Sequence, residues 1–234
     1  MENRGVAIAQ PVLLAIETSQ RQGGVAVRDH QGRTHVERLA STLRQDDDLL
    51  GAIDRLYTRL KLKPKATEAV GVSIGPGAFT GLRIAVSTVK MICEALGTKI
   101  IAVPSALVAA ASYEGPGPII VALAAKGPTA WATQLDRVGG MWQIIGDGRL
   151  IDADSLGLDQ IKALFADEHL PQKMRAKCEH AGVPVVEPMF DPRACLAVAA
   201  HRLDQGCTTD PLALGPLYPR QPEAVAVWER RHPS

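Results

Sequence analysis

The chain has 234 residues, of which 46% are hydrophobic, 22% charged and 4% aromatic. A chain of this length can bury a substantial core, which here must consist largely of Ala, Val, Leu and Ile. Lys and Arg number 26 against 25 Asp and Glu, and this near-neutral balance argues against a large basic surface for nucleic acid. The four cysteines include no CxxC pair, which indicates reduced thiols in a cytoplasmic protein rather than a disulfide scaffold.

The N-terminal part of the chain predicts a three-stranded antiparallel meander. Residues 12–16 and 25–27 are short apolar runs, and residues 34–40 alternate between apolar and polar. Gln10 and Pro11 interrupt the apolar residues before the first run, so we expect no secretory signal there. No run approaches the length of a membrane-spanning helix, and we expect no association with a membrane.

An amphipathic helix is predicted next, because apolar residues recur every three or four positions between Leu49 and Leu60. Asp46, Asp47 and Asp48 stand at its start, where acidic side chains interact favourably with the helix dipole. Successive residues of a helix point about 100° apart, so three in a row cannot converge on one metal ion. We therefore expect these aspartates to cap the helix.

The rest of the first half continues with alternating strands and helices. Strands are predicted at residues 69–74 and 99–103, and helices at residues 80–96 and 105–113. The sequence "EGPGP", residues 114–118, is rich in glycine and proline, and we predict a domain boundary there.

The second half repeats the order of the first. Its predicted elements are strands at 119–123, 129–135 and 141–145, a helix at 155–165, a strand at 183–186 and a helix at 192–203. Both halves read strand-strand-strand-helix-strand-helix, which indicates a duplicated α/β fold with mixed sheets flanked by helices. We predict an N-terminal lobe at residues 1–113 and a smaller, reduced C-terminal lobe at residues 114–234, whose tail returns to the first lobe.

A glycine-rich corner, "GVSIGPGAFTGLR" at residues 71–83, joins a predicted strand to a predicted helix. Gly75 and Gly77 can take positive φ on either side of a proline and turn the chain sharply, and the Thr80 hydroxyl can cap the helix. A Walker P-loop is excluded, because no lysine follows the last glycine.

Three interpretations of this corner stay open. It can be a tight structural turn, an anion or nucleotide contact at the helix N-terminus beside Arg83, or part of a partner-binding surface. The dinucleotide-binding fingerprint is disfavoured, because Thr80 occupies the place of its third glycine and the strand at 99–103 carries no acid.

The sequence predicts neither a catalytic residue nor a metal site. The six histidines form no HExxH motif, and Cys178 and His180 have no second pair to complete a zinc site. Ser19 has no base near it in sequence, and the chain contains no GxSxG elbow. On its own, the chain is under-equipped as an enzyme.

Three segments, "LLAIETS", "VSIGPGAFTGLRIAVSTVK" and "LYPR", resemble the TsaB (YeaZ) family. These bacterial proteins belong to the tRNA threonylcarbamoyladenosine pathway and are often labelled glycoprotease-like. The resemblance covers the first half of the chain well and the second half loosely. It implies the two-lobed fold of the actin-like ATPase superfamily, which is ribonuclease H-like.

The resemblance also implies a non-catalytic role. Members of the family pair with a TsaD-type partner, and the pair works with an ATPase subunit to transfer threonylcarbamoyl to the adenosine beside the tRNA anticodon. The chain would then contact tRNA only indirectly, bind no cofactor tightly, and have ATP or ADP as candidate ligands at the partner interface. When alone, it could form a homodimer.

The resemblance assigns two groups of residues. The partner interface would involve helices of the first lobe, with residues Leu50, Ile53, Tyr57, Ile84 and Met91. The nucleotide or anion contact would involve Glu17, Thr18, Ser19, Gly75, Gly77, Thr80, Gly81 and Arg83.

The chain departs from the family pattern in three places. Glu17 stands where members usually carry Asp, Asp46 or Asp47 replaces a usual histidine, and residues 124–126, Ala-Ala-Lys, replace a usual Asp-Ala-Arg. Two alternative functions stay open. One is a stand-alone glycoprotease-like hydrolase or small ATPase, which needs a metal or a competent acid. The other is a homodimeric binding module whose helices pair with themselves.

Overall fold

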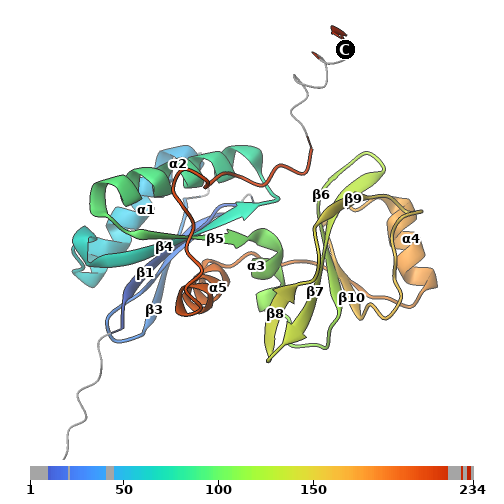
Figure 1. Ribbon diagram of the computed structural model, residues 1–234, viewed down its shortest axis with the longest axis horizontal. Coiled ribbons are helices and arrows are strands. Elements are labelled where there is room, and N and C mark those ends of the chain that lie inside the picture. The colour runs from blue at the N-terminus through green and yellow to red at the C-terminus, as the bar shows by residue number, and fades with distance from the viewer. Residues whose placement is uncertain (1–9, 21, 41–44, 221–227, 229–230, 233–234) are drawn as a thin grey trace, which may run out of the picture. The chain divides into compact units, whose positions relative to one another are not determined.

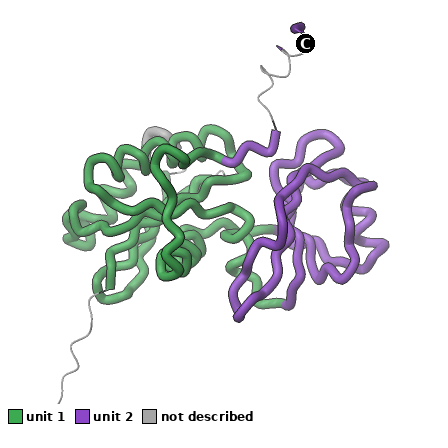
Figure 2. The backbone as a smooth tube through the Cα atoms, in the orientation of Figure 1, with its two compact units in different colours: residues 1–115, 188–216 green, residues 116–187, 217–234 purple. Residues whose placement is uncertain are grey.

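The computed structural model describes residues 10–20, 22–40, 45–220, 228 and 231–232, without the side chains of residues 45–47. The backbone forms two compact units (Figure 2). Unit 1 comprises residues 1–115 and 188–216, and unit 2 comprises residues 116–187 and 217–234. Each unit contains one mixed sheet flanked by helices, so the predicted duplicated α/β fold is confirmed.

The elements of unit 1 are β1 (Val12–Glu17), β2 (Gly24–Arg28), β3 (Thr34–Arg38), α1 (Gln45–Leu60), the 3₁₀ helix η1 (Pro64–Ala66), β4 (Thr67–Gly75), α2 (Phe79–Leu96), β5 (Lys99–Pro104), α3 (Ser105–Ala111) and α5 (Pro192–Asp204). Its sheet has the order β3-β2-β1-β4-β5 (Figure 1). The first three strands form the predicted antiparallel meander, and β4 runs parallel to both β1 and β5.

Strand β1 is buried because helices cover both faces of this sheet. On one face, Leu14 packs in a cluster with Leu56 of α1 and Val89 of α2. On the other face, Leu13 packs with residues of α3 and α5, among them Ala199. Side chains alternate between the two faces along a strand, so a strand covered on both sides must be apolar throughout.

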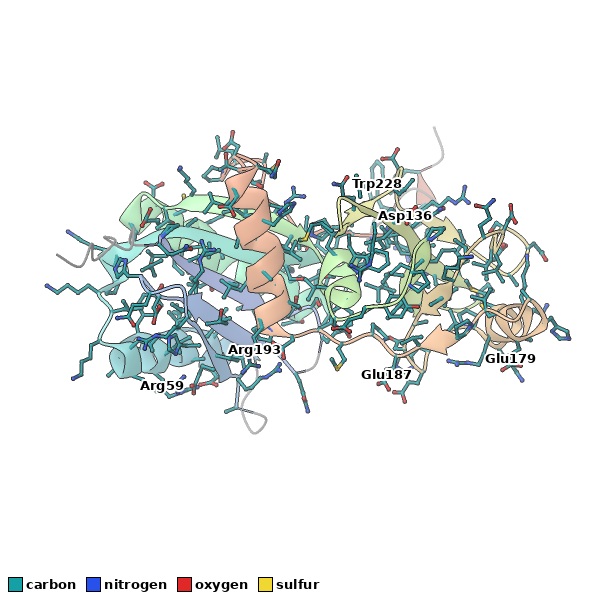
Figure 3. All side chains as sticks on the ribbon, turned by 90° about the horizontal axis from the view of Figure 1, so that it is seen from below. Arg59, Asp136, Glu179, Glu187, Arg193 and Trp228 are labelled. Atoms are coloured by element: carbon teal, nitrogen blue, oxygen red, sulfur yellow. The ribbon has the colours of Figure 1, made fainter. Side chains whose placement is uncertain are left out.

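Helix α5 belongs to unit 1, although the sequence placed it in the second lobe. Its N-cap residue Asp191 accepts a hydrogen bond from the amide of Arg193 and forms an ion pair with Arg38 of β3 at 2.7 Å. Figure 3 labels Arg193 at the start of this helix. A side chain at Gly71 of β4 would collide with Ala199 of α5. The segment that returns to the first unit is therefore residues 188–216, because α5 buries its apolar face there. The chain from Leu217 onward lies in unit 2.

The elements of unit 2 are β6 (Ile119–Lys126), β7 (Thr129–Val138), β8 (Met141–Ile144), β9 (Arg149–Ile151), β10 (Ala163–Phe165), α4 (Gln172–His180) and β11 (Val185–Val186). Its sheet has the order β11-β10-β6-β7-β8, and β9 also pairs with β7. Read from the other edge, this order matches that of unit 1: β8, β7, β6, β10 and β11 take the places of β3, β2, β1, β4 and β5. Helix α4, between β10 and β11, takes the place of α2. In the part of the chain that is described, a loop at residues 152–162 takes the place of α1.

The predicted helix at 155–165 is wrong. Leu156 and Ile161 do pack into the core of unit 2, but they do so from a loop, and residues 163–165 form the buried strand β10 beside β6. Helix α4 was not predicted, because it buries only Met174 and Cys178 and so has a weak apolar pattern. Among the described residues, no helix is long and apolar enough to cross a membrane.

Candidate functional site

The turn after β1 is completely enclosed. Glu17, Thr18 and Ser19 are each at most 1% exposed. The Ser19 amide donates to the Glu17 carboxyl at 2.7 Å, and the Thr18 hydroxyl donates to the Gly81 carbonyl of α2 at 2.9 Å. Thr18 and Gly81, which the resemblance assigned to a nucleotide contact, therefore hold the turn against α2 instead.

The glycine-rich corner packs directly on this turn. Gly75 has a φ of +106°, which favours glycine, and a side chain at Gly77 would collide with the Ser19 carbonyl. The Ala78 amide donates to the same carbonyl at 2.7 Å. Helix α2 begins at Phe79 with Ala78 as its N-cap, so the predicted capping by Thr80 is wrong. Among the interpretations of the corner, that of a tight structural turn describes this geometry.

The Glu17 carboxyl is buried at the end of β1, beside Ser73 near the end of the parallel strand β4. Burial raises its pKa, and the hydroxyl and amide of Ser19 and the hydroxyl of Ser73 offset part of this effect. Ser73 also shares a hydrogen bond of 2.8 Å with Ser105. The thiol of Cys195 on α5 lies 3.7 Å from the Ile16 carbonyl of β1, and burial raises the pKa of that thiol. Desolvation of this kind favours the protonated form of an acid.

These residues do not fit a nucleotide bound at the turn itself. A phosphate needs accessible amides, hydroxyls or cations, whereas the turn is buried and the Ala78 amide is already paired. Thr80 and Arg83 are exposed on the outer side of α2, where the Arg83 guanidinium lies 5.1 Å from the centre of the Phe79 ring. The structure thus separates the candidate nucleotide residues into a buried inner set and an exposed outer pair.

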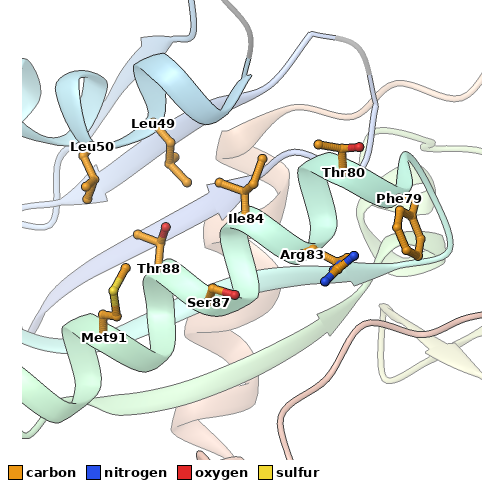
Figure 4. Close-up of a pocket in the computed structure, with 9 residues that line it drawn as sticks. All are labelled: Leu49, Leu50, Phe79, Thr80, Arg83, Ile84, Ser87, Thr88 and Met91. Atoms are coloured by element: carbon orange, nitrogen blue, oxygen red, sulfur yellow. The ribbon is translucent and has the colours of Figure 1, made fainter.

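An apolar groove lies between α1 and α2 (Figure 4), and its volume is about 510 Å³. Leu50 of α1 is 58% exposed, and Phe79 and Met91 of α2 are 53% and 58% exposed. Large apolar side chains gathered on one surface often mark a site of protein association. The groove is lined by Leu49, Leu50, Phe79, Thr80, Arg83, Ile84, Ser87, Thr88 and Met91.

Three of the five predicted interface residues, Leu50, Ile84 and Met91, line this groove. Ile53 is half-buried and packs against the core of unit 1. The prediction that Tyr57 belongs to the interface is wrong. Tyr57 is only 6% exposed, and its hydroxyl shares a hydrogen bond of 2.7 Å with Thr67. An outward contact by Tyr57 is excluded because this aromatic ring is part of the core.

Phe79 is an exposed apolar groove residue that the sequence analysis did not assign to the interface. The helix was expected to start one residue later, so Phe79 was assigned to the corner. A signal was present, because Phe79, Arg83 and Ser87 are spaced by four residues and therefore share one face of α2.

An ionic network fixes α1, which forms one wall of the groove, to β3. Arg55 donates to both carboxylate oxygens of Asp48, at 2.8 and 3.0 Å, and to Glu37 of β3. Arg59 also donates to Glu37, at 2.7 Å. Hydrogen bonds from Arg55 and from the Ala40 amide lower the pKa of Asp48. Asp48 thus has a structural role; the side chains of the other two aspartates, at 46 and 47, lie outside the described residues.

Comparison with known proteins identifies the family. The model of a family described as "TsaD: tRNA N6-adenosine threonylcarbamoyltransferase" matches residues 12–145, which is more than half of the chain. The chain belongs to this family. Membership links it to the threonylcarbamoyladenosine modification of tRNA.

Two solved structures share the fold. YeaZ from Pseudomonas aeruginosa superimposes with a TM-score of 0.74 at 19% identity, covering 89% of this chain and 100% of that one. A crystal structure of "an uncharacterized protein with similarity to peptidase YEAZ from Pseudomonas aeruginosa" gives a TM-score of 0.73 at 20% identity, covering 90% and 100%. The family match and the YeaZ fold together confirm the resemblance to TsaB (YeaZ) proteins.

Residues 124–126, Ala-Ala-Lys, where the chain departs from the usual Asp-Ala-Arg of TsaB proteins, lie at the end of β6. Ala124 there has a positive φ of +51°, and its carbonyl accepts a hydrogen bond of 2.7 Å from Arg220, the arginine of "LYPR". Arg220 also donates to the carbonyl and hydroxyl of Thr129 at the start of β7. The arginine thus fastens the β6–β7 hairpin. Among the described residues, no three His, Cys, Asp or Glu side chains are placed to hold a metal ion.

Proposed function

We propose that this protein is a non-catalytic pairing subunit of the threonylcarbamoyladenosine machinery, which uses the groove between α1 and α2 to bind a TsaD-type partner. The observation that carries the proposal is the exposure of Leu50, Phe79 and Met91 on one surface of unit 1. Complete burial of such a side chain contributes about 1.5–3 kcal/mol, so a partner that covers all three gains substantial affinity.

The chemistry of the groove supports a protein partner. Its centre is apolar, and the exposed polar groups of Thr80, Arg83 and Ser87 can form hydrogen bonds at its edge. An apolar centre with an aromatic ring and an arginine, surrounded by polar groups, is the composition typical of protein interfaces. A nucleotide contact at that interface would use Thr80 and Arg83, since the turn at Glu17 is closed.

We also propose that this protein catalyses no reaction on its own. The acid at the end of β1, Glu17, is buried, and burial raises its pKa, so it is poorly suited to bind a metal or to activate water. The net charge of +1 favours contact with tRNA through the partner and its ATPase subunit rather than through a basic surface of this chain.

Co-purification with the cognate TsaD-type protein tests the proposal. Replacing Leu50 and Met91 together by Glu should reduce the recovered complex at least about tenfold, because each change places a charge in an apolar contact. Leu212→Glu is the matched control, since Leu212 is 92% exposed and does not line the groove. A complex that survives the double change, or that never forms with the unaltered chain, would refute the proposed pairing.

A second measurement addresses the biological role. In cells depleted of their own pairing subunit, the unaltered chain and Leu212→Glu should restore threonylcarbamoyladenosine in tRNA, as measured by mass spectrometry of the nucleosides. The double variant should fail to do so. Restoration by the double variant would show that the groove is dispensable, and homodimers that persist in sizing experiments with the partner present would favour the homodimeric module.

A further inference from the structure

Unit 2 contains a cavity on the sheet face that α1 covers in unit 1. In unit 1, Leu49 and Leu56 of α1 pack against that face. In unit 2, the loop at residues 152–162 replaces the helix and leaves a cavity of about 370 Å³ beside β7 and β9. This volume lies within the range of small-molecule sites in proteins, which is about 300–1,000 Å³.

The pairing of the strands defines the floor of this cavity. Ile120 of β6 lies opposite Gln134 of β7, and Ala132 of β7 lies opposite Arg149 of β9. Residues opposite each other on paired strands, and residues two apart on one strand, share a face. Gln134 and Arg149 therefore extend from the same face as the buried Ile120, Ala132 and Ile151, so an amide and a guanidinium stand beside an apolar floor.

Two acidic side chains line the same cavity from its loops. Asp147 lies in the connection between β8 and β9, and Asp159 lies in the loop that replaces the helix. Across the described part of the chain, no ion pair within 4.0 Å joins Arg149 to an acid. Arg55 of unit 1, in contrast, pairs with two acids. Opposite charges thus line one cavity, at its exposed edge, with no such ion pair between them among the described residues.

Ser155, which also lines the cavity, forms hydrogen bonds within the loop. The Ser155 hydroxyl donates to the Asp152 carboxylate at 2.6 Å and accepts from the Asp152 amide at 2.9 Å. Hydrogen bonds from Ser155 lower the pKa of Asp152. This turn fixes the start of the loop, while Leu156 and Ile161 pack its next residues onto the core. The wall that carries Asp159 is therefore tied down at both ends.

We infer that unit 2 binds a small zwitterion, an α-amino acid with an aliphatic side chain, in this cavity. The carboxylate of the ligand pairs with Arg149, whose planar guanidinium suits bidentate binding of carboxylates. The ammonium group is held by Asp147 and Asp159, and the aliphatic side chain lies on the floor formed by Ile120, Ala132 and Ile151. The inference is independent of the proposed pairing, because the groove of unit 1 shares no residue with this cavity.

Titration of the full-length, isotope-labelled protein with L-leucine, followed by amide NMR shifts, tests the inference. We expect saturable shifts concentrated in residues 145–161. Leucinamide, which lacks the carboxylate, and N-acetyl-L-leucine, which lacks the ammonium, should each bind at least about tenfold more weakly, because each leaves one charged group of the cavity without a partner. No saturable shift at about 10 mM L-leucine, or shifts of equal size with a blocked analogue, would overturn the inference.

Two variants of equal charge change complete the test. Arg149→Gln should weaken L-leucine binding at least about tenfold, since one charge-assisted interaction is lost. Lys173→Gln, at an exposed position of α4 that does not line the cavity, should leave the affinity unchanged. Both sites are exposed, and circular dichroism verifies that the variants fold. Equal affinities of the two variants would refute the role of Arg149 and with it the inferred site.

Discussion

The two units share one strand order but end their first strands differently. In unit 1, β1 ends in Glu17, whose carboxyl is buried beneath a corner formed by Gly75 and Gly77. In unit 2, Ala124 stands near the end of β6, and an arginine from the C-terminal segment, Arg220, donates to its backbone carbonyl. The end of the first strand is thus closed by packing in unit 1, whereas in unit 2 it carries Ala124 and no acid at that position.

The units also differ in what covers the sheet beside that position. Unit 1 uses α1, which an ionic network ties to β3, and the paired helices leave an apolar groove on their outer side. In unit 2 a loop covers the sheet, and a cavity lined by charged residues lies between this loop and strands β7 and β9. The same strand order therefore carries an apolar groove where a helix covers the sheet and a charged cavity where a loop does.

The largest expected effect is that of Gly77→Ala. The added methyl group would collide with the Ser19 carbonyl, so the corner must separate from the β1 turn. We expect the free energy of unfolding of unit 1 to fall by about 3 kcal/mol or more, measured by urea denaturation. Gly215→Ala is the control in the same unit, because nothing lies within 4 Å of its new methyl group. Equal stability of the two variants would show that the corner does not clamp the turn.

Asp48→Ala should have the next largest effect. The buried side chain accepts hydrogen bonds from Arg55 and from the Ala40 amide, so its loss removes two charge-assisted bonds to Arg55 and leaves the partly buried Ala40 amide without a partner. We expect a loss of about 2 kcal/mol at neutral pH. The folded-state pKa of Asp48 is lowered, so its contribution is present above the usual value of 3.8 and is lost as the pH falls below it. The difference between Asp48→Ala and the unaltered chain should therefore shrink in acid, and a constant difference would contradict this origin.

Glu17→Gln, in contrast, should stabilise the protein. Burial raises the folded-state pKa of Glu17, so ionisation favours the unfolded chain, and stability falls as the pH rises above the usual value of 4.5. The amide of Gln is neutral and can still accept from Ser19. We expect a gain on the order of 1 kcal/mol at pH 8 and almost none at pH 4, measured by thermal unfolding. Glu94→Gln, at an exposed site of α2, should change neither value. A loss of stability at pH 8 would show that Glu17 is charged in the fold.

The sequence predicted the first unit better than the second for physical reasons. Strands such as β1, covered on both faces, are continuous apolar runs and are easily recognised. Leu156 and Ile161 imitate a helical pattern, although they reach the core from a loop. No local pattern reveals that α5 returns to unit 1, because that depends on Gly71 and Ala199 fitting together across a long sequence separation.

The candidate site shows the same limit. Leu50, Ile84 and Met91 were found because they lie off the buried stripes of their helices, which is a local property. Tyr57 was misplaced, because its burial depends on a hydrogen bond with Thr67, a residue of another element. The closure of the turn at Glu17 could not be predicted either, since it requires the contact between the corner and the Ser19 carbonyl.

The smallest expected effect is that of Arg220→Gln in unit 2. This change removes the donors that hold Ala124 and Thr129 at the two ends of the β6–β7 hairpin. We expect a loss of about 1 kcal/mol, seen as faster amide hydrogen exchange in β6 and β7 with no change in β1 or β4. Lys173→Gln, at an exposed position of α4 in the same unit, serves as the control. Faster exchange in unit 1 would mean that Arg220 stabilises more than its hairpin. Faster exchange in β6 and β7 alone would mean that Arg220, from the C-terminal segment, secures the end of β6. In unit 1, packing of the glycine corner secures the end of β1.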